Sequence, residues 1–440
     1  MIKKNFEDSF TQEWIDNNIT DPTNELVILR QIIPWDKLTE ELSQFYNDTK
    51  GRIGKSIRVV IAVLLLSKLR LLSDENVIKS IKENRYYQYF CNVSDDELSH
   101  FLHPSTLCRI RKRLGEKGFE IMEDIVFKKL HWANVVDPEY ALIDSSVLES
   151  NIVYPTDVKL VFNAFNKMAN FAGKHNISLW WDHDAIKAMW REFCLNKEKN
   201  AGDYLIDFAM TFRDALATFK LYLILLGSPE HTPMDVEQLL EILTLLDQQN
   251  ELKMNGEKHI PSRIVSLDEI DARPIKKGKN FPECEFGSTF QATFNRQGFI
   301  ITIENFIGKP NDKKLYPNAV ELFNKRMGEY PKIAVTDLGY RSQSNLTDSQ
   351  KNINTVFMGR SDDVQTAVQK ACQKARAATE GFIAVIKNWR GMKRSLYKGF
   401  SGDRIWSILC QAAHNLKKFI QLFQKEALSE ESLMKLGLLG

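Results

Sequence analysis

Two aspartates and a glutamate occupy positions where acidic side chains can do chemistry. Asp144 ends the apolar run ALID and Asp337 ends the run KIAVTD, which predicts that each lies at the end of a buried strand. Glu380 lies in RAATEGFIAVIK, four residues after Arg376 and seven before Lys387. Two strand-end carboxylates and one helical carboxylate are the ligands that a pair of divalent cations needs for phosphodiester chemistry.

The helical pattern around Glu380 also has a plainer interpretation. Apolar residues recur at helical spacing between residues 363 and 387, and Arg376 and Glu380 share another face one turn apart. An arginine, a glutamate and a lysine at this spacing are by themselves typical of a solvated ion-pair stripe. The two strand-end aspartates are what favour the chemical interpretation.

The order of the acids and the segments around them resemble a known family. Arg-x3-Glu-x6-Lys follows the two aspartates, and the segments DSSVLESNIVYPTD, EFGSTFQ and DLGYRS accompany them. The chain resembles the DDE transposases of bacterial insertion sequences over residues 52–419, and more narrowly the group with a Tyr-Arg-Glu-Lys signature. This resemblance implies a ribonuclease-H-like catalytic domain, hydrolysis at the DNA ends of a mobile element, and attack of the freed 3′ hydroxyl on target DNA.

The resemblance also implies a site. Asp144, Asp337 and Glu380 would be the catalytic residues and would hold two Mg²⁺ or Mn²⁺ ions, while Arg376 and Lys387 would contact phosphate. Gln373 stands where the signature has its tyrosine. The part that the tyrosine plays at a hairpinned DNA end is therefore not carried over, although an amide can still donate to a phosphate oxygen.

Two other functions fit the same acids. A ribonuclease-H-like nuclease would cut DNA without joining it, and a strand-transfer assay with precut ends separates it from a transposase. A domesticated, inactive transposase would only bind DNA. The presence of all three acids argues against that function, and a Mg²⁺-dependent nicking assay discriminates it.

Basic residues gather in two zones although the net charge is only +2. Residues 51–118 contain 13 Lys/Arg against 7 Asp/Glu, and residues 359–418 contain 12 against 4. Such zones predict localised surfaces for double-stranded DNA, here the terminal inverted repeats and the target, with a solvated basic face as the alternative. Besides Arg376 and Lys387, the cations expected at DNA are Arg109, Arg111, Lys112, Arg113, Arg390, Lys393 and Arg394. Trp389, Tyr397 and Trp406 interleave with the second group, either to stack on unpaired bases or as core anchors.

These residues need four segments to position them. We expect a loosely structured lead-in (residues 1–50), a helix-turn-helix-like DNA-binding domain (51–135), a DDE catalytic domain (136–428) and a tail (429–440). The basic helix of the second segment should stop at Gly115. The fold class is α/β: a ribonuclease-H-like mixed sheet flanked by helices and preceded by an all-α domain.

The catalytic domain contains a predicted helical insertion at residues 158–258, where apolar residues step by three and four. Residues 180–184, WWDHD, include metal-ligand types, but adjacent side chains on a helix point in different directions, so capping or surface packing is the better interpretation. Strands are expected near residues 140–147, 263–267, 288–295, 298–305, 332–336 and 354–358, and helices at residues 315–327, 363–387 and 404–423.

Composition favours a cytoplasmic protein that acts at the nucleoid. The longest purely apolar run, residues 59–66, is far too short to span a bilayer. Residues 1–10 lack the apolar core of a signal peptide, and the six cysteines include no CxxC pair. We expect a homodimer when the protein is bound to DNA.

Overall fold

The computed structural model describes residues 9–46, 55–99, 101–196, 201–225, 234–257, 259–276, 284–359 and 366–439. The chain forms two compact units. Unit 1 comprises residues 1–148, 289–397 and 401–440, and unit 2 comprises residues 149–288 and 398–400. Among the helices that the structure describes, none combines the length and apolar character that crossing a lipid bilayer requires.

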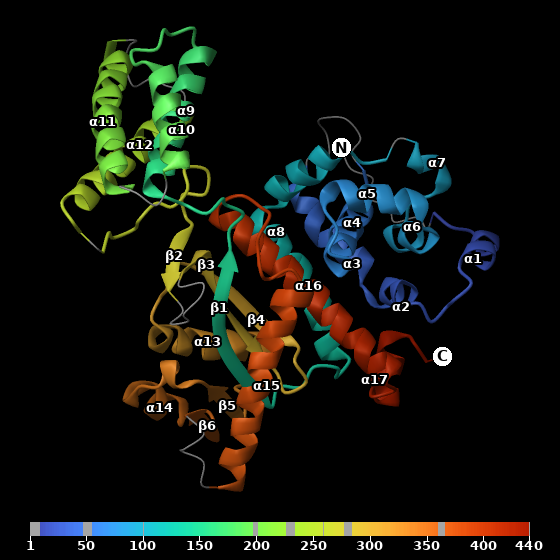
Figure 1. Ribbon diagram of the computed structural model, residues 1–440. Helices are drawn as coiled ribbons and strands as arrows, with labels where there is room; N and C mark the ends of the chain where they lie inside the picture. Colours follow the sequence, from blue (N-terminus) through green and yellow to red (C-terminus); the bar gives the residue numbers. More distant parts are fainter. Residues whose placement is uncertain are drawn as a thin grey trace. The chain divides into compact units, whose positions relative to one another are not determined.

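Unit 1 begins with a bundle of helices (Figure 1). They are α1 (Gln12–Asn18), α2 (Glu25–Ile32), α3 (Trp35–Leu42), the 3-10 turn η1 (Ser43–Phe45), α4 (Ile57–Leu69), α5 (Asp74–Glu83), α6 (Arg85–Cys91), α7 (Asp95–Leu98) and α8 (Pro104–Trp132). Every residue of α4 is buried, because its sequence is apolar on all sides and the other helices surround it. The backbone leaves helical geometry at Gly115 (φ 55°) and resumes a helix beyond it, as a glycine at a helix end allows.

The described part of the lead-in, residues 9–46, is largely helical rather than loosely structured. Leu26, Leu29, Leu38 and Leu42 of α2 and α3 are at most 1 % exposed and share one core with α4. Asn24 caps α2 by accepting a hydrogen bond from the Leu26 N–H. The apolar segments of α2 and α3 are short, but they are stable because they pack on the apolar α4.

The sheet of unit 1 is mixed. β1 (Tyr140–Glu149) pairs in parallel with β5 (Ile333–Thr336), which pairs in parallel with β6 (Thr355–Met358). On the other side of β1 lies β3 (Cys284–Phe294), which pairs antiparallel with β4 (Ile300–Ile307). The predicted strands near these positions are present, apart from residues 263–267.

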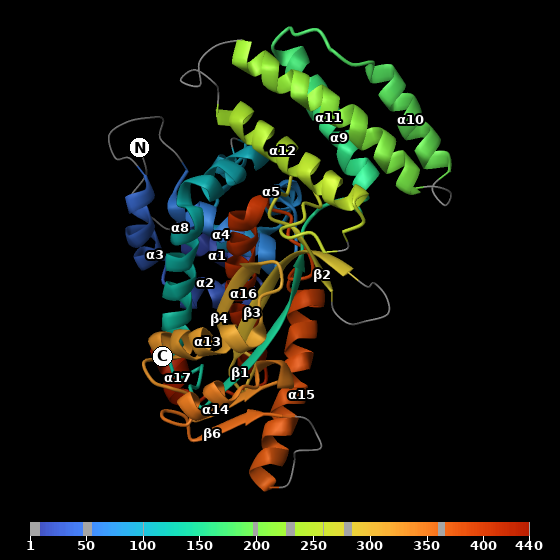
Figure 2. The ribbon, with the colours of Figure 1, turned by 90° about the vertical axis from the view of Figure 1, so that its left-hand side faces the viewer.

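Helices cover both faces of this sheet. They are α13 (Asp312–Met327), the 3-10 turn η3 (Leu338–Tyr340), α14 (Gln343–Ser349), α15 (Ala367–Trp389) and α16 (Gly399–Gln424), followed by α17 (Glu430–Leu436). Figure 2 shows α13 and α15 on opposite sides of β1. Alternation along β1 explains the two layers, because Leu142 packs in the core that includes α15 while Ile143 packs in the core that includes α13.

The turn between β3 and β4 fixes α15 against the sheet. Gly298 has φ +89°, and a Cβ added there would lie 2.7 Å from the ring of Phe382 on α15. Phe382 also packs on Phe294 of β3, with ring centroids 5.5 Å apart. No residue type other than glycine combines this φ with so close an approach. Gly298 therefore fixes the position of α15 at Phe382, two residues after Glu380.

Unit 2 contains a four-helix assembly with its own core (Figure 1). The helices are α9 (Asp157–Lys174), α10 (His183–Leu195), α11 (Ala201–Leu225) and α12 (Met234–Met254). Phe208, Phe212 and Phe219 of the predicted seam are buried. Asp182 caps α10 by accepting from the N–H groups of Asp184 and Ala185, both at 3.0 Å, which is the capping interpretation of the WWDHD segment.

One expected strand is absent. The described backbone of residues 263–267 forms no strand; instead, the side chain of Gln249 accepts from the Ile264 N–H (2.7 Å) and donates to its carbonyl oxygen (3.1 Å). Residues 263–267 have high strand propensity, but the backbone N–H and carbonyl of Ile264 form their hydrogen bonds with a side chain instead of a neighbouring strand. The strand in this region is β2 (Arg273–Lys276), which pairs antiparallel with the first residues of β3.

Candidate active site

The parallel pairing of β1 with β5 brings two of the predicted acids together. Leu142 pairs with Val335, and the same offset places Asp144 beside Asp337. Neighbouring strands lie about 4.8 Å apart, and paired residues of a parallel ladder point to the same face. Both aspartates therefore lie on the face covered by α15. Asp337 directly follows the last residue of β5, but β1 continues for five residues beyond Asp144, so the expectation that Asp144 ends its strand is wrong.

The Asp144 carboxylate is held in a poorly solvated and negatively charged environment. Burial, together with the charges of Asp337, Asp312 and Glu380, raises its pKa to about 7, although a hydrogen bond from the Ser145 N–H at 2.7 Å acts in the opposite direction. Among the described residues no Lys or Arg forms an ion pair with Asp144. A buried carboxylate among other carboxylates is what an absent cation would stabilise.

Asp337 occupies the first turn after β5. It caps η3 by accepting a hydrogen bond from the Gly339 N–H at 2.9 Å. Burial raises the pKa of Asp337, the Asp312 charge raises it as well, and the Arg376 charge lowers it. The strand end and the cap together fix the carboxylate at the edge of the sheet.

Glu380 lies on α15, which contacts β5. Its side chain is 63 % exposed and forms an ion pair with Arg376, one turn earlier, at 2.9 Å. The predicted trio therefore collects at one edge of the sheet, with two acids from strands and one from the covering helix. Their role as metal ligands stays a prediction.

A fourth acid lies at the same edge and was missed from the sequence. Asp312 is the first residue of α13, and its Oδ1 accepts a hydrogen bond from Ser145 Oγ at 3.0 Å. It follows Asn311, a helix cap, so its pattern is that of an ordinary first-turn acid. The signal that could have found it was its position at the start of the helix that precedes β5.

The donor set suits a hard divalent cation. All four groups are carboxylates, and Gly339 leaves a gap between two of them that a Cβ would fill, 3.1 Å from Asp337 Oδ1 and 3.3 Å from Asp312 Oδ2. In the part of the chain that the structure describes, no three Asp, Glu, His or Cys side chains already converge on one point. The acids thus fit Mg²⁺ or Mn²⁺ by chemistry and charge, and the side chains would have to turn to close on an ion.

Of the four predicted DNA-binding residues on α8, three are exposed and one is buried. Arg109, Lys112 and Arg113 are exposed on α8. Arg111 is buried: it donates to both carboxylate oxygens of Asp74, at 2.9 and 2.5 Å, and its guanidinium lies 4.2 Å from the centroid of the Tyr397 ring. The expectation that Arg111 faces DNA is therefore corrected, because periodicity could not reveal that α5 and Tyr397 meet this face of α8.

The predicted DNA-binding residues after α15 also differ in exposure. Lys393 and Arg394 are exposed, whereas Arg390 is half-buried and donates to the Trp389 carbonyl oxygen at 2.8 Å. Trp389 is 67 % exposed, but Trp406 is buried and donates to the Gly391 carbonyl oxygen at 2.9 Å. The Lys68 ammonium lies over the rings of both Tyr397 and Trp406, so these two aromatics are core anchors.

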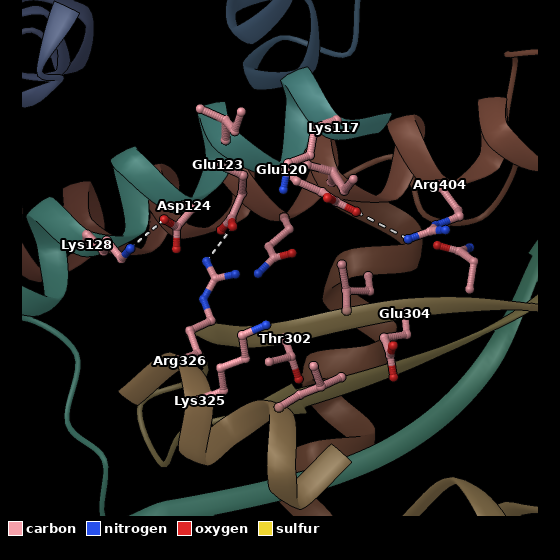
Figure 3. Close-up of a pocket in the computed structure, with 16 residues that line it drawn as sticks. Lys117, Glu120, Glu123, Asp124, Lys128, Thr302, Glu304, Lys325, Arg326 and Arg404 are labelled. Carbon is pink, nitrogen blue, oxygen red and sulfur yellow. Dashed lines mark hydrogen bonds and ion pairs between the residues drawn. The ribbon is translucent and has the colours of Figure 1, made fainter. Parts of the chain in front are cut away.

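A separate cleft of about 480 Å³ in unit 1 is lined by α8, β4, α13 and α16 (Figure 3). None of the four acids described above lines it. Six of its charged residues form ion pairs: Arg326 with Glu123, Lys128 with Asp124 at 2.8 Å, and Arg404 with Glu120 at 3.3 Å. The cleft is therefore distinct from the candidate site.

Comparisons with known proteins found one family model and one similar protein. Residues 13–113 match the family model described as Transposase domain (DUF772), a match that crosses the boundary expected at residue 50. A Rhizobium meliloti protein described as "Uncharacterized protein ORF8 in nfe locus" is 30% identical over 164 residues, which cover 37% of this chain and 79% of that protein. The chain belongs to the family of this rhizobial protein. No solved structure matches.

The ion pair between Arg111 and Asp74 gives a stability prediction. Arg111→Ala should lower the free energy of unfolding by about 2–3 kcal/mol, because it leaves the largely shielded Asp74 carboxylate without its partner. Arg109→Ala, the exposed control on the same helix, should change it by less than about 0.5 kcal/mol. Urea unfolding of both variants measures this, and equal effects would contradict the structural role of Arg111.

The environment of Asp144 predicts how the metal-free protein responds to pH. Burial raises the folded-state pKa to about 7 from 3.8, so between these values the folded state keeps a proton that the unfolded state releases. The contribution of Asp144 to the free energy of unfolding therefore falls as the pH rises through this range. At about 1.4 kcal/mol per pKa unit the loss amounts to a few kcal/mol.

Urea unfolding of the wild type and Asp144→Asn in EDTA, from pH 4 to 8, tests this response. The wild type should lose stability relative to the variant as the pH rises. His414 contributes the opposite slope in both proteins, because burial lowers its pKa to about 4 and its contribution is lost as the pH falls. The difference between the two curves therefore isolates Asp144, and a difference independent of pH would contradict the assigned environment.

Proposed function

We propose that the protein is the DDE transposase of an insertion sequence, with a ribonuclease-H-like catalytic domain. The observation that carries this proposal is the pairing of β1 with β5, whose register aligns Asp144 with Asp337 on the face covered by the helix that bears Glu380. The transposase domain matched at residues 13–113 supports the same function. The substrates would be the terminal inverted repeats of the element and its target DNA.

Asp144, Asp337 and Glu380 would hold the two divalent ions. Bound there, the ions would activate the attacking oxygen, first of water and then of a DNA 3′ hydroxyl, and stabilise the leaving oxygen. The chain itself supplies the orientation: two carboxylates fixed by strand register and one on a packed helix. The Gly339 N–H donates a hydrogen bond to the Asp337 carboxylate and so orients it.

The DNA backbone would lie across the exposed cations near the end of α15. Lys393 and Arg394 follow the turn at Gly391 and face solvent. Arg376, next to Glu380, would contact the phosphate closest to the reacting group, with Lys387 further along the helix. The exposed Trp389 ring offers a stacking surface for an unpaired base between these cations. Two copies of the chain would act on two DNA ends.

The main alternative is a nuclease that cuts without joining, because the same acids serve both reactions. Precut DNA ends separate the two: a transposase joins the 3′ hydroxyl of such an end to a second duplex, and a nuclease does not. Joined product with wild-type protein, absent with Asp337→Asn, would support the proposal.

Glu380→Gln should abolish cleavage without weakening DNA binding. The amide keeps the size of the side chain and removes a charge that repels phosphate, but it is a poor ligand for Mg²⁺. Nicking of an end-containing duplex should fall by at least about a thousandfold, as expected when a group needed in the transition state is removed. Binding of the same duplex should stay equal or tighten slightly.

Glu329→Gln is the matched control, because it makes the same change at an exposed acid beyond the end of α13. It should leave both nicking and binding unchanged. Near-normal nicking by Glu380→Gln would return Glu380 to the solvated ion-pair interpretation.

Replacing Lys393 and Arg394 together by Ala should weaken binding to any DNA sequence. Removing one cation from the DNA backbone should reduce the slope of log affinity against log salt by about 1, so the double variant should reduce it by about 2. Fluorescence anisotropy across a salt series measures the slope.

The control removes two exposed lysines that belong to neither group of predicted DNA-binding residues, Lys128 of α8 and Lys351 after α14. Its slope should equal that of the wild type. If the Lys393/Arg394 variant also kept the wild-type slope, the exposed cations of α8 would become the main DNA contact.

A further inference from the structure

Asp312 reaches the candidate site from the opposite side of the sheet. Side chains alternate along β1, so Asp144 faces α15 while Ser145 faces α13. Ser145 Oγ donates to Asp312 Oδ1 at 3.0 Å, at the point where β1 passes the first residue of α13. The acids of the site therefore come from both layers of helices, and not from the α15 layer alone.

Asp312 and Asp337 face one another across Gly339. A Cβ at residue 339 would lie 3.1 Å from Asp337 Oδ1 and 3.3 Å from Asp312 Oδ2, so the two oxygens are separated by no more than the sum of these distances. A hard cation binds carboxylate oxygens at about 2.0–2.6 Å, so a small turn of either side chain would let one ion reach both. The glycine keeps this gap free of a side chain.

An ordinary first-turn acid does not account for this arrangement. A carboxylate at a helix N-terminus stabilises the helix by about 0.3–1 kcal/mol, and exposed positions achieve that without cost. Asp312 instead lies beside the Asp337 carboxylate at Gly339, and it accepts a hydrogen bond from Ser145, the residue after Asp144. No ion pair with Lys or Arg offsets the repulsion at Asp312 among the described residues. Placing a third aspartate here is favourable when a cation binds between the acids.

We propose that Asp312 is a fourth carboxylate of the metal site and binds a Mg²⁺ or Mn²⁺ ion together with Asp337. This inference rests on the proposed function, because it assigns a further ligand to the same site. Asp144 and Glu380 complete the site from the α15 side, and Asp312 closes it from the α13 side. Ser145 holds the Asp312 carboxylate in place.

Direct measurement of metal binding tests the assignment without any DNA. Asp312→Asn keeps the size of the side chain and an oxygen that can accept from Ser145. Isothermal titration with Mn²⁺ should show an affinity about 10- to 100-fold weaker than that of the wild type, and the thermal stabilisation by Mn²⁺ should shrink accordingly. In EDTA the variant should be no less stable than the wild type, because repulsion is relieved.

A matched variant separates this role from a general effect of removing a helix-start acid. Glu430→Gln removes an acid from the first turn of α17, far from the acids of the site in the sequence, and it should bind Mn²⁺ within about threefold of the wild type. Ser145→Ala removes the hydrogen bond that positions the Asp312 carboxylate, so it should also weaken Mn²⁺ binding, by about 10-fold or more. Wild-type affinity in Asp312→Asn would overturn the inference.

A second measurement uses the unchanged protein, so it does not depend on whether a variant folds. Fe²⁺ in place of Mg²⁺, with ascorbate and peroxide, generates hydroxyl radicals that cut the backbone beside the ion. Cuts are expected near residues 144, 312 and 337. Cuts at 144 and 337 without 312 would overturn the Asp312 assignment alone, whereas a wild type that neither binds Mn²⁺ nor is cut would overturn the proposed metal chemistry as well.

Discussion

The parallel pairing of β1 with β5 is the constraint on which the site depends. Register is a discrete property: a slip of one residue would turn every side chain of β1 to the other face, moving Leu142 out of the core that it shares with α15. The burial of Leu142 and Val335 therefore also fixes Asp144 beside Asp337. Hydrophobic packing holds two like charges together at a place where electrostatics alone would separate them.

Contacts elsewhere in unit 1 fix the position of α15 relative to the edge of the sheet where the aspartates lie. Phe382 rests on Gly298 in the β3–β4 turn, and the other side of this turn is tied to α16, where His414 Nε2 donates to the Gly298 carbonyl oxygen at 2.8 Å. Asn415 of α16 bonds both the N–H and the carbonyl oxygen of Ile300, at 2.8 and 2.9 Å, which satisfies the backbone of the edge strand. The hairpin is thus clamped between two helices, and the position of Glu380 follows from side chains outside the site.

Local patterns predicted most of the elements of the sheet and its covering helices, and they singled out three acids that the structure gathers near one edge of the sheet. An acid after a short apolar run and an acid within a helical repeat are visible in the sequence, because strand ends and helix faces have fixed periods. Asp312 was not found, since its role depends on a contact with Ser145, 167 residues away along the chain. Arg111 was misassigned for the same reason, because its partners Asp74 and Tyr397 come from other elements.

The ion pair between Arg376 and Glu380 is compatible with a metal role for Glu380. The pair is exposed and lies within one helix, so it contributes only about 0.3–0.5 kcal/mol, and Glu380 can turn toward a divalent cation at little cost. Arg376 Nε is buried and has no hydrogen-bond partner in the described chain. A guanidinium released by Glu380 would still lack that partner, and a phosphate oxygen is the acceptor that suits it. Under the proposed function, ion and DNA binding would therefore reinforce one another: the ion draws Glu380 away from Arg376, and the freed arginine meets the phosphate.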